Sequence, residues 1–525
     1  MGSDPRCDGQ ADVTSGAALE GAARARHAAG DHRGALELYE AAFGSYRDEG
    51  ELVSAARAAR TVGWFRGWVF GEWAIYQGWS GQAMALLERV ADDSAIGWRL
   101  CEQARRGDDL DTQRRQYTEA MGLARQAGDD DLECEATASL GLMLVFSGPV
   151  REGMLHLDRA LAAICGGSVQ ELPVLEGCLC GLLNACERTQ DVDRAEQWLQ
   201  AAEPIIRRGN LVAVGGHCRA HYAGILLNAG RWEAAESELR RAIDLLAGRD
   251  ALRDSALCRL ADLRLRQGRL EEAGGLLADL EHHEDAIVPL ARLHLATGRP
   301  RLAVELVDRY LSLGGRPDYV EGPLLAVSVQ AHLTGGEIDA ATRCSDRLAA
   351  LARVQSTAAL RGLAAVASAQ LCAATSSGDP RSCWHEAVSY FANAKMPFER
   401  AIARLDLARL TADDRPEVAI AEASAAFDDL TALGAVHSAD QAAALLRALG
   451  APARTGPKGH AELTKREQDV LALLGHGLTN SQIGARLFIS PKTVEHHVGR
   501  VLAKLGVRSR AEAAAHAARR GKMGA

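Results

Sequence analysis

Residues 463–505, LTKREQDVLALLGHGLTNSQIGARLFISPKTVEHHVGRVLAKL, carry the start signals of three short helices. Two threonines are each followed three positions later by Glu or Gln, the spacing of a capping box that satisfies free N–H groups at a helix start. A serine followed by proline supplies a third N-cap, with the proline at the first helical position. These pairs are Thr464 with Glu467, Thr479 with Gln482, and Ser490 with Pro491. The sequence therefore predicts three consecutive helices.

Each of these short helices can be stable only by burying one face against the others. Their apolar residues recur at spacings of three and four, which places them on one side of a helix. The three stripes are Val470, Leu471 and Leu474; Ile483 and Leu487; and Val494, Val498, Val501, Leu502 and Leu505. With its valines turned inward, the third helix keeps an opposite polar face that is free for a groove.

The run from Leu463 to His516 resembles the LuxR-type DNA-binding domain of bacterial transcription regulators, a four-helix bundle without a wing. Caps, core positions and turn glycines all match without a gap, so the resemblance is more specific than a bare helix-turn-helix pattern. It implies that the helix starting at Ser490 is the recognition helix, which enters the major groove. It also implies that the helix after Ser509 forms a dimer contact.

The resemblance assigns individual positions to DNA. The base-facing positions are Lys492, Glu495, His496 and Gly499, and the positions near the sugar-phosphate backbone are Thr493, His497 and Lys504, with Arg500 on the same flank. Further predicted contacts lie at the starts of the second and third helices, at Thr479, Asn480, Ser481 and Ser490.

Two base-facing positions depart from the response-regulator branch of the family. Glu495 stands where that branch often has a basic residue, and Gly499 has no side chain. A carboxylate can accept a hydrogen bond from N4 of cytosine and repels phosphate, so we expect a different preferred site. The large ATP-dependent regulators of the family commonly carry Glu there, which places this chain nearer to them.

The predicted fourth helix begins at a capping box, Ser509 with Glu512, and is rich in alanine. One interpretation is a good helix former that closes the bundle. The other, which the resemblance favours, is a seam where two copies of the chain meet, formed by Ala511, Ala514, Ala515 and Ala518. A homodimer of this kind would read two half-sites related by a two-fold axis and about one DNA turn apart.

Charge is unevenly distributed along the chain. The whole chain has a formal net charge of −9, but residues 460–525 contain 11 Lys and Arg against 5 Asp and Glu, a net +6 that leaves −15 for residues 1–459. Five of the six lysines lie in the last 68 residues. A compact basic domain on an acidic body suits phosphate contact in one orientation. The alternative is that these lysines form only a solvated face.

A repeat runs through the preceding part of the chain. Counted from a glycine, or once from a glutamine, a small residue follows after five positions, a large apolar residue after nine and another apolar residue after twelve. The units are Gly30, Ala35, Tyr39, Ala42; Gly148, Gly153, Leu157, Ala160; Gln190, Ala195, Leu199, Ala202; Gly230, Ala235, Leu239, Ala242; Gly268, Ala273, Leu277, Leu280; and Gly298, Ala303, Val307, Tyr310. Small residues also stand seven positions before the glycine, at Ala23, Gly141, Ala223, Ala261 and Ala291.

This pattern predicts helical hairpins in which small residues lie at the helix crossing and the glycine ends the first helix. It resembles the tetratricopeptide repeat. With aromatic residues at only 5% and few alternating strand-like runs, the chain is predicted to be all-α. We expect a tetratricopeptide-like helical solenoid of nine to ten hairpins over residues 17–450, then a linker at 451–460 and the small LuxR-type domain at 461–525. Residues 1–16 are expected to be a disordered tail.

Residues 398–450 resemble the segment before the DNA-binding domain in large ATP-dependent LuxR-type regulators. Those proteins begin with a nucleotide-binding module, which needs a glycine-rich loop and Gly-Lys followed by Ser or Thr. The only Gly-Lys pair here, Gly521-Lys522, is followed by Met523. No cofactor is therefore predicted, and sensing falls to the helical repeats, whose surface suits a peptide, protein or small-molecule effector.

The segment VGWFRGWVFGEWAIYQGW at 62–79 holds four of the eight tryptophans. Such density is typical of a core between repeats, and the alternative is an aromatic pocket or docking face. Arg66 and Glu72 exclude a membrane span there. The twelve cysteines include no CxxC pair, and Cys178 and Cys180, two apart on a helix, point to different sides, so a structural role is favoured over a metal site.

Together these features predict a cytoplasmic bacterial transcription regulator, an activator as most of the resembled family are, that binds double-stranded DNA as a homodimer and contacts RNA polymerase. No membrane partner is expected. The alternative is an interaction scaffold that the same domain tethers to promoters. No nucleophile, acid pair or metal cluster at supporting spacing was found, so an enzyme is not predicted.

Overall fold

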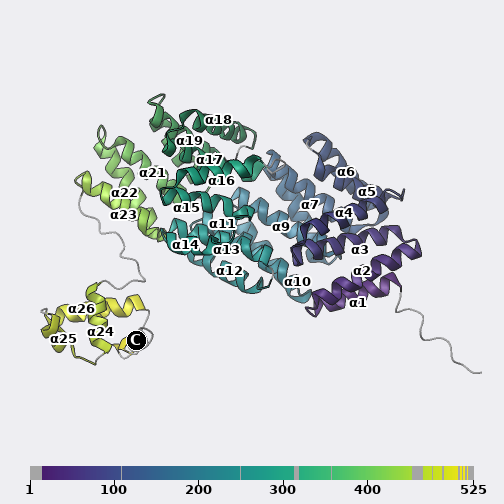
Figure 1. The fold of residues 1–525 in the computed structure, drawn as a ribbon, viewed down its shortest axis with the longest axis horizontal. Coiled ribbons are helices and arrows are strands. Elements are labelled where there is room, and N and C mark those ends of the chain that lie inside the picture. Colours follow the sequence, from purple (N-terminus) through teal and green to yellow (C-terminus); the bar gives the residue numbers. More distant parts are fainter. Residues whose placement is uncertain are drawn as a thin grey trace, which may run out of the picture. The chain divides into compact units, whose positions relative to one another are not determined.

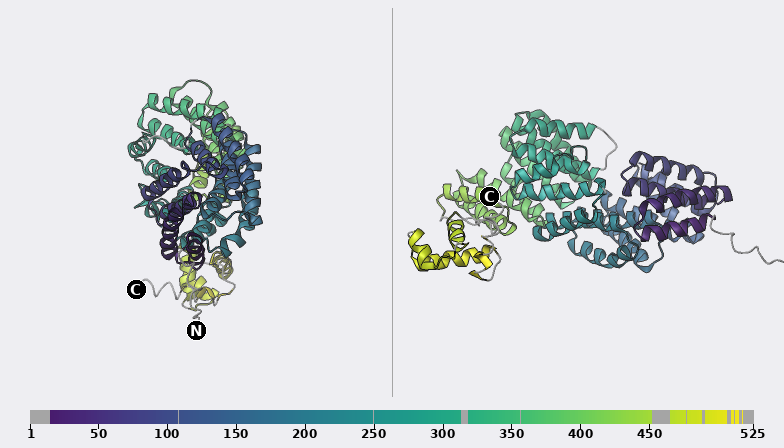
Figure 2. Two further views of the ribbon diagram at one scale, coloured as in Figure 1. Left: turned by 90° about the vertical axis from the view of Figure 1, so that its right-hand side faces the viewer. Right: turned by 60° about the horizontal axis from the view of Figure 1, so that its bottom comes forward.

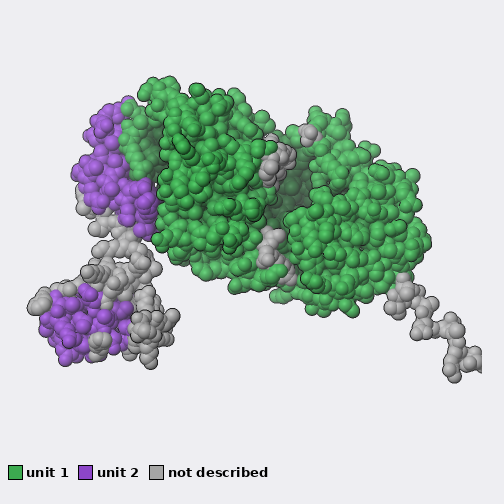
Figure 3. All heavy atoms as spheres, viewed as in Figure 1, with its two compact units in different colours: residues 1–410 green, residues 411–525 purple. Residues whose placement is uncertain are grey.

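The structure is a computed structural model that describes residues 15–517 except positions 108, 249, 313–317, 356, 452–464, 476, 488–489, 506–508, 511 and 515–516. Helices follow one another through this part of the chain, and no strand occurs in it (Figure 1). The all-α prediction is confirmed. The chain divides into two compact units, residues 1–410 and 411–525 (Figure 3).

The first unit consists of the following helices, with one π-helical turn, η1 (Phe65–Val69), and one 3₁₀ turn, η2 (Glu284–Ala286). They are α1 (Gly16–Ala28), α2 (His32–Glu49), α3 (Leu52–Trp64), α4 (Trp73–Leu87), α5 (Asp93–Arg106), α6 (Leu110–Ala127), α7 (Asp130–Ser147), α8 (Val150–Gly166), α9 (Leu172–Thr189), α10 (Val192–Arg208), α11 (Val212–Asn228), α12 (Trp232–Leu245), α13 (Asp250–Arg266), α14 (Leu270–Leu277), α15 (Ile287–Ala296), α16 (Pro300–Ser312), α17 (Asp318–Gly335), α18 (Ile338–Gln355), α19 (Ala358–Thr375), α20 (Pro380–Asn393) and α21 (Pro397–Thr411).

These helices form a stack of hairpins. In the described residues, α1 to α20 pair in chain order into ten hairpins (Figures 1 and 2). From α5 to α19, the first helix of each hairpin also packs against the first helix of the next. This is the arrangement expected of a tetratricopeptide-like solenoid.

The repeat positions have the roles that the sequence predicts. The residue that ends the first helix has a positive φ in all six units, including Gln190 at 55°, where glycine would be favoured. The residues five and nine positions later are buried. Gly141 and Gly153 lie at the crossing of α7 and α8, where a Cβ on Gly141 would come within 2.8 Å of the Gly153 carbonyl oxygen.

The solenoid also folds back on itself, which the repeat pattern does not predict. Nη2 of Arg60 in α3 donates to both carboxylate oxygens of Glu171 at the start of α9, at 2.7 and 2.8 Å. Near the other end of the unit, Trp232 of α12 packs on Phe398 of α21 with ring centroids 5.6 Å apart. Repeats distant in sequence are therefore tied together by aromatic and charged side chains.

Within the described part of the chain, α19 alone has the length and composition of a membrane-crossing helix, with mean hydropathy 1.3 over 18 residues. It packs against α17, α18 and α20 in the helical stack. Only 22% of this window is buried, and a single helix of this kind is weak evidence for a span.

The second unit contains α22 (Pro416–Leu433) and α23 (Val436–Ala448), which pack as a hairpin, and α24 (Lys465–Gly475), α25 (Asn480–Leu487) and α26 (Pro491–Leu505). The unit begins at Thr411, before the predicted boundary at 450. The predicted linker, apart from Ala451, and most of the predicted N-terminal tail lie outside the described residues; α1 begins at Gly16, one residue inside the predicted tail.

Candidate DNA-binding site

A small apolar core holds α24, α25 and α26 together. Val470 and Leu474 of α24, Ile483 of α25, and Val494 and Val498 of α26 are all buried in one cluster. Full burial of a side chain of this size stabilises a fold by about 1.5–3 kcal/mol. The inward-facing stripes predicted for the three helices are confirmed at these positions.

Two of the predicted helix starts, at Thr479 and Ser509, are capped by side chains. Oε1 of Gln482 accepts from the backbone N–H of Thr479 at 2.9 Å, and Oγ1 of Thr479 accepts from the backbone N–H of Gln482 at 3.4 Å. Oγ of Ser509 accepts from the backbone N–H of Glu512 at 3.2 Å. In the predicted pair of Thr464 and Glu467, the threonine lies outside the described residues.

The outward side of α26 carries the polar residues that the sequence places there. Lys492, Glu495 and Gly499 are exposed, opposite the buried valines. His497 is half-buried, and its Nδ1 makes no hydrogen bond within the described structure. The remaining predicted residues of the helix belong to α26, but their side chains lie outside what is described: Thr493, His496, Arg500 and Lys504.

The four predicted contacts at the helix starts differ in their surroundings. Thr479, Ser481 and Ser490 are exposed, whereas Asn480 is half-buried. Nη1 of Arg510 donates to Oδ1 of Asn480 at 2.7 Å, and Nη2 of the same guanidinium donates to the Leu478 carbonyl. Arg510 thus fixes the start of α25, a role that no periodicity in the sequence indicates.

The fourth helical segment closes the bundle with its alanines. Ala513 is fully buried in a cluster with Leu471 and Val501, and Ala517 packs against the same cluster. Of the predicted dimer seam, only Ala514 is described, and it is half-buried. The other seam residues, Ala511, Ala515 and Ala518, lie outside the described part of the chain.

A recognition-type helix whose apolar side is buried and whose polar side is exposed, set across a second capped helix, defines a helix-turn-helix DNA-binding domain. The family described as "Bacterial regulatory proteins, luxR family" matches residues 461–517. Through this domain the chain belongs to the luxR family.

Three relatives illustrate the similarity. An HTH-type transcriptional regulator of Mycobacterium tuberculosis is 42% identical over 95 residues, which cover 18% of this chain and 11% of the relative. The DNA-binding transcriptional activator DevR/DosR of the same species is 51% identical over 55 residues, covering 10% of this chain and 25% of the relative. The spore germination protein GerE of Bacillus subtilis is 43% identical over 61 residues, covering 12% of this chain and 82% of that protein.

The matched part of the chain therefore spans only a small share of the mycobacterial regulator's length. Among solved structures, yeast Tom70 aligns over 82% of this chain and 96% of its own, with 13% identity and a TM-score of 0.28, a likeness too weak to support an argument.

The helical repeats contain a hollow of about 500 Å³ between α10, α11 and α12. Arg219 lies in it and donates to Glu238 at 2.7 Å and to Glu203 at 2.8 Å. Tyr222 and Arg241 contribute to the same lining. The lining of the hollow mixes polar and apolar side chains, and its Arg219 is held in place by two carboxylates.

One part of the aromatic segment at 62–79 is core, as the first interpretation of its sequence expects, and another part is exposed, as the docking-face interpretation expects. Trp64 and Phe65 are buried, as expected of a core between repeats. Trp73 and Ile75, at the start of α4, are 42% and 44% exposed, as expected of a docking face. The change falls at η1, where the helix widens into a π-helical turn.

Proposed function

We propose that this chain is a bacterial transcription regulator whose luxR-family domain binds double-stranded DNA through α26. The observation that carries the proposal is the exposure of Lys492, Glu495 and Gly499 on the side of α26 opposite its buried valines. The net charge of +6 over residues 460–525 supports contact with phosphate. The names of the relatives, several of which are transcriptional regulators, support the same function.

The finer parts of the proposal concern how the domain is used. Two copies bind a two-fold site through an alanine seam on the fourth helix, and the bound dimer activates transcription by contacting RNA polymerase in the bacterial cytoplasm. A related protein named as a transcriptional activator supports this choice. The helical repeats act as the sensor, and the hollow beside Arg219 is a candidate effector site.

The test is a footprint of the full chain on duplexes that it selects from genomic DNA. We expect two protected half-sites with centres about one helical turn apart. Protection of a single half-site at saturating protein would contradict the two-fold arrangement. Failure to select any duplex would contradict DNA binding itself.

The second candidate is an interaction scaffold, favoured by the size of the repeat domain and by the exposed Trp73 and Ile75. Deleting residues 1–450 separates the two functions in a reporter strain. A regulator's C-terminal fragment still occupies its site by footprinting and changes transcription, whereas a scaffold's fragment occupies the site without any output.

A further inference from the structure

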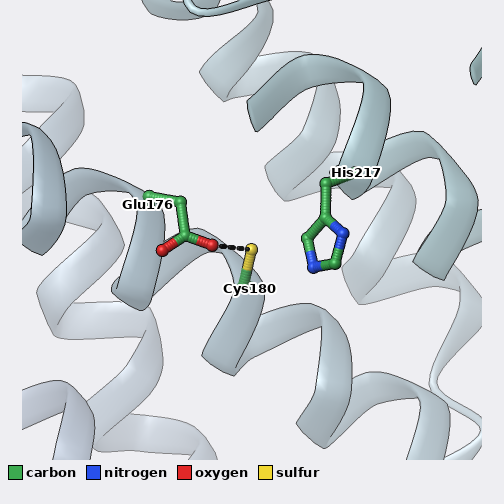
Figure 4. A group of neighbouring side chains, drawn as sticks. All are labelled: Glu176, Cys180 and His217. Carbon is green, nitrogen blue, oxygen red and sulfur yellow. Dashed lines mark hydrogen bonds between the residues drawn. The ribbon is translucent and has the colours of Figure 1, made fainter. Parts of the chain in front are cut away.

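Two pairs of potential metal ligands face each other between neighbouring helices of the repeat domain. Glu176 and Cys180 are one turn apart on α9, and His217 and His221 are one turn apart on α11, which packs against α9. The ligand atoms of Glu176, Cys180 and His217 all lie within 4.8 Å of one another. Figure 4 shows the three side chains converging from the two helices.

The fourth residue is arranged as metal-bound histidines commonly are. Nε2 of His221 lies 3.2 Å from Nε2 of His217, close to the separation of about 3.3 Å for two nitrogens on one tetrahedral zinc ion. Its other nitrogen, Nδ1, lies 3.2 Å from Oε2 of Glu187. Arg259 holds that carboxylate at 2.5 Å. Nη2 of Arg259 lies 3.2 Å from the same Nδ1, so Glu187 and Arg259 together hold the ring of His221 beside His217.

We propose that Glu176, Cys180 and His217, with His221 as fourth donor, bind one zinc ion between α9 and α11. One sulfur, one oxygen and two nitrogens form a donor set that tetrahedral Zn²⁺ accepts. The carboxylate and the thiolate together carry two negative charges, which balance the two positive charges of the zinc ion. That neutrality matters because an unbalanced charge in a buried position is costly.

Binding forms one Zn–O, one Zn–S and two Zn–N bonds. The S–H bond of Cys180, which donates to Oε1 of Glu176 at 2.9 Å, breaks and releases its proton to solvent. Glu176 binds as the carboxylate, so any proton on it also passes to solvent. The site is independent of the DNA-binding domain.

His217 connects the cluster with Trp68. Glu176 and Cys180 are buried, whereas His217 is half-buried and its ring packs edge-on against Trp68 with centroids 5.5 Å apart. A bound ion would tie the hairpin of α9 and α10 to that of α11 and α12. It would also change the surroundings of Trp68, which gives the site a fluorescence signal.

The experiment measures metal binding to the full chain after removal of metal with a chelator. We expect one zinc ion per chain and, with Co²⁺ as the probe, a thiolate-to-cobalt charge-transfer band with tetrahedral d–d bands. Cys180→Ser should abolish the charge-transfer band. His221→Gln removes a proposed direct ligand and should weaken zinc binding by more than the about 10–100-fold that is typical of losing a residue that only orients a ligand. Cys186→Ser is the matched control, because Cys186 is buried on the same helix outside the cluster, and it should bind zinc like the unmodified chain.

If Cys180→Ser does not fold, His217→Gln provides a second test, because His217 is only half-buried. This variant should no longer bind one zinc ion per chain. If the full chain binds no zinc at micromolar concentration, the cluster is only a set of hydrogen-bonded core residues. Survival of the cobalt–thiolate band in both Cys180→Ser and His217→Gln would equally overturn the proposal.

Discussion

At the residue scale, Glu495 is an exposed carboxylate on the face of α26 that we assign to DNA. A carboxylate cannot attract phosphate, so its contribution must come from choosing among bases. We therefore expect Glu495→Ala to reduce discrimination at one base pair of the selected site by about 1–3 kcal/mol while leaving the salt dependence unchanged. Binding to a set of single-base variants of the site measures this. Equal discrimination in the variant and the unmodified chain would remove Glu495 from the base-reading residues.

A second residue, Asp262 in α13, makes the stability of the repeat domain depend on pH. It accepts from Nε of Arg266 at 2.9 Å and from Nη1 of Arg292 at 2.6 Å. Burial alone would raise the pKa of Asp262, but the two guanidinium groups lower it to about 2. Because this folded-state pKa lies below the ordinary value of 3.8, the stabilisation is complete above pH 3.8 and is lost as the pH falls towards 2.

The test compares the free energy of unfolding of the unmodified chain with that of Asp262→Asn. The advantage of the unmodified chain should shrink by about 1 kcal/mol between pH 6 and pH 3, out of about 2 kcal/mol in all. Urea titrations at the two pH values provide the measurement. A constant difference between the two proteins would show that the two arginines do not hold Asp262 ionised.

At the element scale, the crossing of α7 and α8 tests whether the small residues of the repeat are needed for close packing of the helices. A Cβ on Gly153 would clash with the carbonyl oxygen of Gly141 and lie 2.8 Å from the backbone nitrogen of Val145. Since backbone atoms cannot move aside without separating the helices, Gly153→Ala should lower the free energy of unfolding by about 1–3 kcal/mol.

Gly122→Ala in α6 is the control for that change, because an added Cβ there meets no atom within 4 Å. It should raise the free energy of unfolding by about 0.5–1 kcal/mol, as expected of alanine in a helix interior. Thermal or urea unfolding of both variants measures these changes in the free energy of unfolding. A loss of similar size in both would mean that the small residues of the repeat are not there for close packing.

The helices and their crossings were predictable because they depend on residues close together in sequence. The positive φ at Gln190 follows from its place in the repeat, even without a glycine to mark it. The contacts of Arg60 with Glu171, and of Arg510 with Asn480, join elements far apart along the chain, and no periodicity announces them. The same holds for Cys180, whose neighbours at the proposed zinc site include His217 on another helix.

At the scale of the whole molecule, the uneven charge affects DNA binding. Residues 1–459 carry a net charge of −15, so they should repel DNA from the basic domain at low salt. The fragment 457–525 should therefore bind nonspecific duplex more tightly than the full chain in 10 mM salt. This difference in affinity should narrow at 150 mM salt, because the Debye length falls from about 30 Å to about 8 Å. Fluorescence anisotropy with one labelled duplex measures both. A difference that does not change with salt would point instead to masking of the DNA-binding face.

The central claim is that α26 presents its polar face to a DNA duplex. Its most direct test is the binding constant of the full chain for a selected genomic duplex, measured over a range of salt concentrations beside the Lys492→Ala variant. The account predicts that the logarithm of the constant falls linearly with the logarithm of salt concentration, and that Lys492→Ala reduces the slope by about 1. A folded chain that shows no salt-dependent binding, or a variant with an unchanged slope and affinity, would contradict it.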